Sequence, residues 1–269
     1  MAQDSFQLNE KAAKQYEKNS VVAVFGPLAE ITLDHIPLFD DDVILDAACG
    51  TGIVARKARK KIGPKPRIIG VDLNKGMIET AQSLSDPYSR SCEWHTADIT
   101  KIPFNDATFS VAICQQGLQF FPDKKAALLE LQRVLKPEGR LVFTVWDSAN
   151  VLFKALAVSL GKHIGHGAVQ QILAPFSYND GAAISDLVSD AGYCDVSVKT
   201  LSVDRTLAAS KSTIHNQIMA NPAGAAVAEK GDEVMALIVD EVFSSLSDCR
   251  HGANFIIPQS THLVQAKTL

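Results

Sequence analysis

The first candidate for chemistry is an acid followed by two glycines. The apolar run Val43-Ile44-Leu45 leads into Asp46, and Gly50 and Gly52 follow within six residues. Such a run is typical of a buried parallel strand, and glycines at a strand-to-helix turn let a ligand lie against bare backbone beside free N–H groups. A carboxylate at this turn disfavours a phosphate and favours a ligand that carries an ammonium or a sulfonium group.

Two further acids follow the next two apolar runs. Asp72 ends the run Arg67-Ile68-Ile69-Gly70-Val71, where a doubly wound fold places an acid that receives the two hydroxyls of a ribose. Asp98 follows the run 92–96, and an acid there can accept the amino group of an adenine. A single Asp in a turn is common without any ligand. Acids at the ends of three successive strands favour a binding role.

The glycines also fit a dinucleotide-binding fingerprint. Gly50-x-Gly52-x-x-Ala55 matches G-x-G-x-x-G/A, and Asp72 lies 20 residues past Gly52. An NAD(P)-dependent Rossmann oxidoreductase is therefore the main alternative. Asp46 would repel a pyrophosphate, Asp98 adds a third acid, and the chain contains no Y-x-x-x-K catalytic pair, so this alternative is less favoured.

The spacing D-x-x-x-G-x-G, followed by an acid at the end of the next strand, resembles the class I S-adenosylmethionine (SAM) dependent methyltransferases. Within them it is similar to the methyltransferase type 11 group around the ubiquinone and menaquinone biosynthesis methyltransferases. The similarity spans residues 40–147 and includes the turn Leu135-Lys136-Pro137-Glu138-Gly139. It implies an α/β fold with a doubly wound, Rossmann-like, seven-stranded sheet in the order 3-2-1-4-5-7-6. Its last strand would be antiparallel, with N-terminal helices and a helical insertion before that strand.

The resemblance also implies roles for residues of a SAM site. Leu73 and Met77 would flank the adenine, the backbone at Gln115 would hold the cofactor's ammonium, and Gln119 would lie next to the reacting methyl group. Met77 could instead be a core contact, and the glutamines could serve only loop backbone groups. The candidate cofactor residues are Asp46, Ala47, Gly50, Thr51, Gly52, Asp72, Leu73, Met77, Ala97, Asp98, Ile99, Gln115 and Gln119.

Two segments outside the expected sheet predict coverings for the site. Residues 1–38, with helical patterns at 8–18 and 20–36, would form an N-terminal helical lid. Residues 39–269 would form the Rossmann-like SAM-binding methyltransferase domain, which contains the second segment. A helical insertion at about 206–249 carries an apolar stripe that could cover an acceptor pocket or join a homodimer. That stripe consists of Val234, Leu237, Ile238, Val242 and Leu246.

Candidates for a catalytic base are few. Tyr16 belongs to the expected lid, where it could also be a packing residue, and His163 and His166 lie in a glycine-spaced segment that reads as mobile. The two histidines have metal-compatible spacing, but no nearby Asp, Glu or Cys completes a ligand set, so no metal is expected. Methyl transfer needs no signature nucleophile, and therefore a non-catalytic SAM-binding scaffold remains a second alternative.

Composition limits the partners. A net charge of -4 gives no general attraction to nucleic acid or an anionic membrane, and no apolar run reaches about 18 residues. Five scattered cysteines without C-x-x-C, and a start that lacks a signal peptide, indicate a cytoplasmic protein. The N-P-P-Y type tetrapeptide of nucleic acid amino methyltransferases is absent after the fourth expected strand, where Cys114-Gln115-Gln116-Gly117 stands instead. The expected reaction is methyl transfer from SAM to a small organic molecule, with the accepting atom left open.

Overall fold

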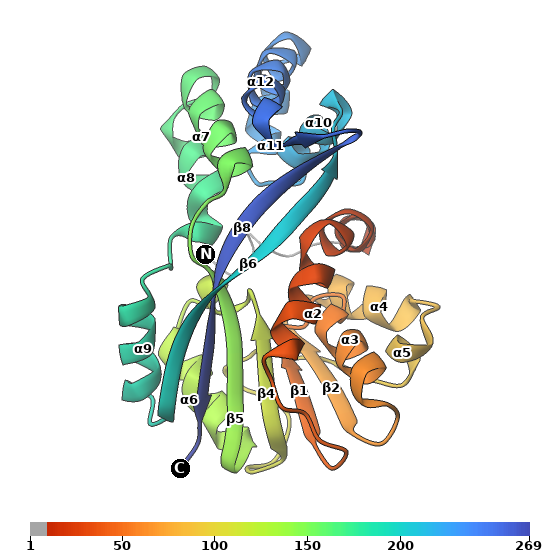
Figure 1. Cartoon of the computed structure of the whole chain (residues 1–269), viewed down its shortest axis with the longest axis vertical. Coiled ribbons are helices and arrows are strands. Elements are labelled where there is room, and N and C mark those ends of the chain that lie inside the picture. The colour runs from red at the N-terminus through yellow and green to blue at the C-terminus, as the bar shows by residue number, and fades with distance from the viewer. Residues whose placement is uncertain (1–9) are drawn as a thin grey trace. The chain divides into compact units, whose positions relative to one another are not determined.

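The computed structural model describes residues 10–269, which form two compact units (Figure 1). The first unit contains the described residues up to Val145 together with Asn179–Leu201 and Thr261–Leu269. The second contains Trp146–Tyr178 and Ser202–Ser260. Each unit is described separately below.

One sheet forms the frame of the first unit, and the residues of its strands that fall within 202–260, including all of β7, belong to the second unit. Its strand order is β3-β2-β1-β4-β5-β8-β6, and β8 runs antiparallel to its neighbours. The short β7 pairs only with β8, so the predicted order 3-2-1-4-5-7-6 is confirmed with β8 as the seventh strand. The strands are β1 (Val43–Ala47), β2 (Arg67–Asp72), β3 (Glu93–Thr96), β4 (Phe109–Gln115), β5 (Leu135–Trp146), β6 (Cys194–Ala208), β7 (Arg250–His251) and β8 (Asn254–Lys267).

The central strands are apolar because both faces of the sheet are covered. In β1, Ile44 and Leu45 are fully buried, and β1 pairs in parallel with both β2 and β4. Ile44 packs in a core cluster with Leu33 of α2 (Gly26–Asp34) and Val54 of α3 (Ile53–Ile62). Burial on both faces explains the continuous apolar runs that predict these strands.

The N-terminal segment is one helical run with an unusual centre. α1 (Glu10–Tyr16) continues into the π-helix η2 (Glu17–Phe25), which continues into α2. The amide of Gly26 donates to the carbonyl of Val21, five residues earlier, as π geometry requires. Two separate helices over 8–18 and 20–36 are therefore not observed within the described residues, because π-helical turns replace the expected break.

The other helices of the first unit begin at polar caps. Asn74 and Asp123 accept hydrogen bonds from amides of the first turns of α4 and α6, as is typical of N-caps. These caps hold the helices that follow β2 and β4. The elements are α4 (Lys75–Ser83), α5 (Pro87–Arg90), η3 (Leu118–Phe120), α6 (Lys124–Val134) and α9 (Gly181–Asp190).

The second unit is mostly helical. Glu241 of α12 accepts a hydrogen bond from Ser159 of α7 at 2.7 Å and pairs with Lys162 and His163 of the same helix. These contacts fasten α7 to α12. The helices are α7 (Val151–His163), α8 (His166–Leu173), η4 (Ala174–Phe176), α10 (Lys211–Met219), α11 (Gly224–Glu229), α12 (Asp232–Ser245) and η5 (Ser247–Cys249).

The second unit adds detail to two expectations. The segment 161–167 is helical except at Ile164 and Gly165, which form the junction between α7 and α8. On α12 the buried face contains Met235, Ile238, Val239 and Val242, whereas Leu237 is 52% exposed. Of the predicted stripe, Ile238, Val242 and Leu246 are therefore buried as expected and Val234 is half-buried, and the prediction is wrong at Leu237.

Candidate cofactor site

The predicted acids lie at the same edge of the sheet. Asp46 pairs with Gly70 of β2 and with Ile113 of β4, which places it near the carboxyl end of the central strands. Asp72 is the last residue of β2, and Gln115 is the last residue of β4. Ligands of open α/β sheets bind at this edge, so the topology brings the predicted residues of the first unit together.

A tight turn connects β1 to α3. The amide of Cys49 donates to Val71 at 3.0 Å, and the amide of Gly52 donates to the carbonyl of Cys49 at 2.8 Å. Gly50 and Gly52 have φ values of 55° and 81°, in the left-handed region that glycine adopts without a steric penalty. This backbone geometry favours glycine at both positions. We refer to residues 48–52 as the glycine loop.

The two glycines have different surroundings. A Cβ at Gly50 would meet only Cε1 of Tyr16, at 4.0 Å, so this side of the loop has room for a ligand. A Cβ at Gly52 would lie 2.1 Å from Cη2 of Trp94, whose indole donates to the carbonyl of Ser89. The expectation that both glycines present bare backbone to a ligand is therefore too broad. At Gly52, packing against Trp94 accounts for the missing side chain.

Asp46 is a buried carboxylate with an unused oxygen. Its Oδ2 accepts a hydrogen bond from the amide of Ala55 at 2.9 Å, while Oδ1 has no partner among the residues described. Burial raises the pKa of Asp46 to about 7; the charge of Asp72 also raises it, and the Ala55 hydrogen bond opposes the rise. A positively charged donor would pair with the free oxygen and favour the ionised form.

Asp72 connects the end of β2 to the glycine loop. Its Oδ2 accepts from the amide of Gly50 at 2.8 Å, and its Oδ1 accepts from the amide of Asn74 at 2.8 Å. Burial raises the pKa of Asp72, and both amide hydrogen bonds lower it. Each carboxylate oxygen can accept a second hydrogen bond, so the capacity to bind two hydroxyls remains.

The residues predicted to surround an adenine are near the ends of β2 and β3. Ala97 donates its amide to the carbonyl of Asp72 at 3.0 Å, and Asp98 is occupied locally by the amide and hydroxyl of Thr100. Leu73 is 43% exposed, Met77 is half-buried and Ile99 is buried. An exposed leucine beside a strand end provides an apolar surface on which a flat ring can stack.

The glutamines at and after the end of β4 hydrogen-bond to two different parts of the chain. Gln115 Nε2 donates to the carbonyl of Phe25 at 3.1 Å, and Gln119 Nε2 donates to Gln116 Oε1 at 2.9 Å. Gln116, which was not predicted as a site residue, donates in turn to the hydroxyl of Thr261 at 2.9 Å. The sequence carries no signal for this contact because Thr261 lies 145 residues away.

At this edge of the sheet, three buried acceptors lack donors within residues 10–269: Oδ1 of Asp46, Oε1 of Gln115 and Oε1 of Gln119. Buried polar atoms nearly always have hydrogen-bond partners. A ligand that brings an ammonium group and a positive charge to this edge would supply the missing donors. The residues present therefore fit SAM. No group of three or more metal-ligating side chains occurs among the residues described.

The candidate bases lie in different units. Tyr16, in the first unit, has its ring centroid 5.4 Å from that of Phe25 and borders Gly50. His163, in the second unit, is the last residue of α7, and its Nε2 lies 3.1 Å from Glu241. The expectation that no acid is near His163 is thus wrong. Sequence could not reveal Glu241 as its partner because 78 residues separate them. His166 is exposed at the start of α8.

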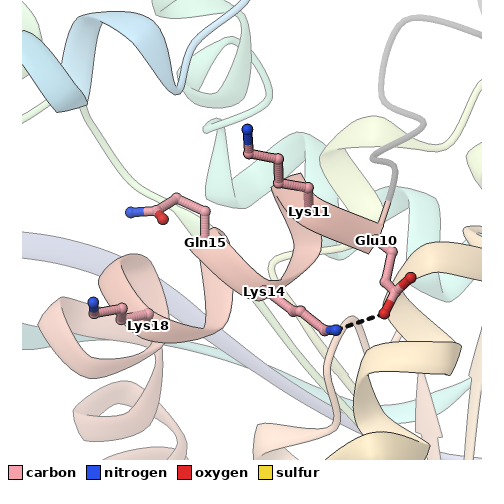
Figure 2. Close-up of a pocket in the computed structure, with 5 residues that line it drawn as sticks. All are labelled: Glu10, Lys11, Lys14, Gln15 and Lys18. Carbon is pink, nitrogen blue, oxygen red and sulfur yellow. Dashed lines mark hydrogen bonds and ion pairs between the residues drawn. The ribbon is translucent and has the colours of Figure 1, made fainter.

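A surface hollow on the N-terminal helix is separate from these residues. It is lined by side chains of α1 and the start of η2, shown in Figure 2: Glu10, Lys11, Lys14, Gln15 and Lys18. Lys14 donates to Glu10 at 2.6 Å, so part of its charge is neutralised within the helix. None of the predicted cofactor residues lines the hollow, and it gives no support to a cofactor site there.

The sheet order and the surrounding helices match the Rossmann-like fold of class I methyltransferases. The sequence model of the methyltransferase domain family matches residues 45–143, which begin in β1 and end in β5. The resemblance predicted from the glycines and acids is therefore confirmed. Among the residues described, no helix is long and apolar enough to cross a membrane.

Two curated methyltransferases resemble part of the chain in sequence. A ubiquinone/menaquinone biosynthesis C-methyltransferase of Hahella chejuensis is 36% identical over 37% of this chain and 41% of its own length. A demethylmenaquinone methyltransferase of Lactobacillus johnsonii is 28% identical over 46% of this chain and 56% of its own length. The chain thus spans about half the length of these curated relatives.

A solved phosphoethanolamine N-methyltransferase of Haemonchus contortus, bound to S-adenosylhomocysteine, shares the fold. Its TM-score is 0.60 at 16% sequence identity, over 99% of this chain and 59% of the other. At this identity the likeness concerns the fold alone.

Proposed function

We propose that the protein is a SAM-dependent methyltransferase that transfers a methyl group from SAM to a small organic molecule. The proposal rests chiefly on the three unpaired buried acceptors at the carboxyl edge of the sheet. These acceptors lie at the edge where the ammonium of SAM would be held, and Asp72, the acid expected to bind the ribose, lies at the same edge. The methyltransferase-domain match over the same strands supports this reading.

Each part of the site has a distinct task in this proposal. The glycine loop and Asp72 would hold the amino acid part and the ribose, and Asp46 with the glutamines would accept from the ammonium. Leu73, Met77, Ala97, Asp98 and Ile99 would hold the adenine. When bound, SAM supplies a methyl group already activated on a sulfonium. The protein then needs mainly to align the acceptor and exclude water.

Several finer features belong to the same proposal. Residues 1–38 would act as a lid, and the insertion at about 206–249 would help to bind the acceptor. The net charge of -4 supports a small acceptor rather than nucleic acid. The names of the curated relatives point to quinone-type acceptors for those proteins; for this chain, the accepting atom remains open. We also propose a cytoplasmic location, no bound metal, and a homodimer as the first assembly to test.

An NAD(P)-dependent oxidoreductase fits these residues less well. Its pyrophosphate would need the backbone near the start of α3, where the indole of Trp94 occupies the Cβ side of Gly52. It would also lie near the Asp46 carboxylate, whose negative charge would repel the pyrophosphate. A catalytically inactive SAM-binding scaffold shares the same site and differs only in turnover.

Turnover separates these functions. Purified protein incubated with SAM and a panel of phenols, quinols, amines and thiols should form S-adenosylhomocysteine with at least one acceptor class. Heat-treated protein provides the control for spontaneous demethylation. Binding of SAM without product across the panel would favour the scaffold. Binding of NAD instead of SAM would overturn the proposed function.

A further inference from the structure

Glu17 links the N-terminal helix to the glycine loop through both carboxylate oxygens. Its Oε1 lies 2.7 Å from Nη2 of Arg56, and its Oε2 accepts from the Thr51 hydroxyl at 2.5 Å. The side chains of Glu17 and Arg56 are only 18% and 10% exposed, so water screens this ion pair weakly. Charge-assisted hydrogen bonds of this kind are stronger than neutral ones.

These contacts are placed where they can affect a ligand. Thr51 lies between Gly50 and Gly52, so Glu17 restrains the glycine loop between its two glycines. Tyr16, the preceding residue, borders the open side of Gly50. At the other end of η2, the carbonyl of Phe25 accepts from Gln115. The π-helix therefore touches two separate parts of the candidate cofactor site.

We propose that Glu17 is a positioning residue that couples order in the N-terminal helix to cofactor binding at the glycine loop. The inference rests on the proposed function and deepens it. Glu17 fixes Thr51 and places Tyr16 beside Gly50, so an occupied loop stabilises residues 10–25 and an ordered helix strengthens binding. Such coupling between two sites is reciprocal.

The chain contains a matched control for this contact. Glu30 of α2 pairs with Lys57 of α3 at 2.5 Å, and so joins the same two helical segments as Glu17 and Arg56. This pair does not include a residue of the glycine loop, and its side chains are 58% and 28% exposed. Glu30→Gln should therefore remove an ion pair between the same segments without disturbing Thr51.

The experiment measures S-adenosylhomocysteine affinity by calorimetry and amide hydrogen exchange of residues 10–25 with and without that ligand. Glu17→Gln should weaken binding by about 10-fold or more, the low end for a hydrogen bond to a charged group. It should also abolish ligand-induced protection of residues 10–25. Glu30→Gln should stay within about 2-fold of the natural protein and keep that protection.

Thr51 provides a second, independent pair of variants. Thr51→Val loses the hydroxyl and should behave as Glu17→Gln does, whereas Thr51→Ser keeps it and should restore the protection. The Glu17→Gln and Thr51→Val effects should add incompletely in the double variant, because both disturb the contact between Glu17 and Thr51, while Glu17→Gln also weakens the pair with Arg56. If Glu17→Gln fails to fold, as judged by thermal melting, the two Thr51 variants decide the question.

The outcomes separate this inference from the proposed function. If the natural protein binds S-adenosylhomocysteine but Glu17→Gln and Thr51→Val keep its affinity and protection, Glu17 positions nothing and only this inference is overturned. Equal losses in Glu17→Gln and Glu30→Gln would also overturn it, since they would show a general effect of ion pairs. If the natural protein does not bind the ligand, the proposed function fails first.

Discussion

The indole of Trp94 occupies the space that a side chain at Gly52 would need. A Cβ at position 52 would lie 2.1 Å from Cη2 of Trp94, whereas a Cβ at Gly50 would approach nothing closer than Tyr16 at 4.0 Å. Two glycines of one motif therefore have different purposes. Gly52 lets β3 pack against the start of α3, and Gly50 keeps one side of the loop open.

This difference predicts that Gly52→Ala mainly lowers stability and that Gly50→Ala mainly lowers SAM affinity. Both substitutions place Ala in a left-handed conformation, which costs about 1–2 kcal/mol. Gly52→Ala should cost about 1–3 kcal/mol more, the range for overpacking, because the indole must move. Gly50→Ala should instead mainly weaken SAM binding. Urea unfolding and calorimetry measure the two effects, and equal loss of stability in both variants would contradict the assignment.

Asp46 predicts a dependence of SAM binding on pH. Its pKa of about 7, raised by burial, means that it is largely protonated at pH 5 and ionised at pH 8. Because the ionised form attracts the cationic ligand, affinity should rise from pH 5 to about 7 and then level off. Calorimetry at pH 6 in two buffers of different ionisation enthalpy should reveal proton release. Asp46→Asn should abolish both effects.

The same carboxyl group affects stability in the opposite direction. Below pH 3.8 both states of the protein hold the proton, and between 3.8 and about 7 only the folded state keeps it. The contribution of Asp46 to the free energy of unfolding should therefore fall as pH rises through this window. Urea unfolding without ligand at several pH values tests the sign. The contribution of Asp46 is the difference in the free energy of unfolding between the natural protein and Asp46→Asn. If this difference rises with pH, the pKa of Asp46 is not raised.

We predict that no single side chain acts as an indispensable general base. Positioning can supply about 7–11 kcal/mol of a barrier, more than the 10² to 10⁴-fold that a base contributes. With a true acceptor and saturating SAM, kcat should fall by less than about 100-fold in Tyr16→Phe, His163→Ala and His166→Ala. A larger loss in one variant that still binds SAM, rescued at high pH, would identify that residue as the base.

The His163 variant needs an additional control because the partner of His163, Glu241, stabilises the contact between α7 and α12. Glu241 joins α7 to α12. The hydrogen bond from Lys162 lowers the pKa of Glu241 most, and together with the hydrogen bonds from Ser159 and His163 it brings this pKa to about 2. Glu241→Gln should therefore lower the melting temperature together with His163→Ala. If Glu241→Gln instead changes the pH profile of kcat and leaves melting unaltered, the pair has a catalytic role.

The sequence predicted those parts of the site that depend on local patterns. Asp72 ends β2, Asp46 lies one residue before the end of β1, and the left-handed turn favours Gly50, so spacing along the chain suffices to find them. Glu17 and Trp94 were missed because their importance arises from contacts with Thr51 and Gly52 across 34 and 42 residues, which no local pattern records. π-helical geometry likewise depends on how a helix packs.

The central claim, that the carboxyl edge of the sheet binds SAM, is tested most directly by titrating the protein with SAM and, separately, with NAD in a calorimeter. We expect saturable binding of SAM and none of NAD. Asp72→Ala should weaken SAM binding by about 1.5–3 kcal/mol, since hydrogen bonds to a charged group are lost. Asp40→Ala, which removes only the exposed pair with Lys65, should leave it unchanged. NAD binding, or equal SAM affinity in Asp72→Ala and the natural protein, would contradict the account.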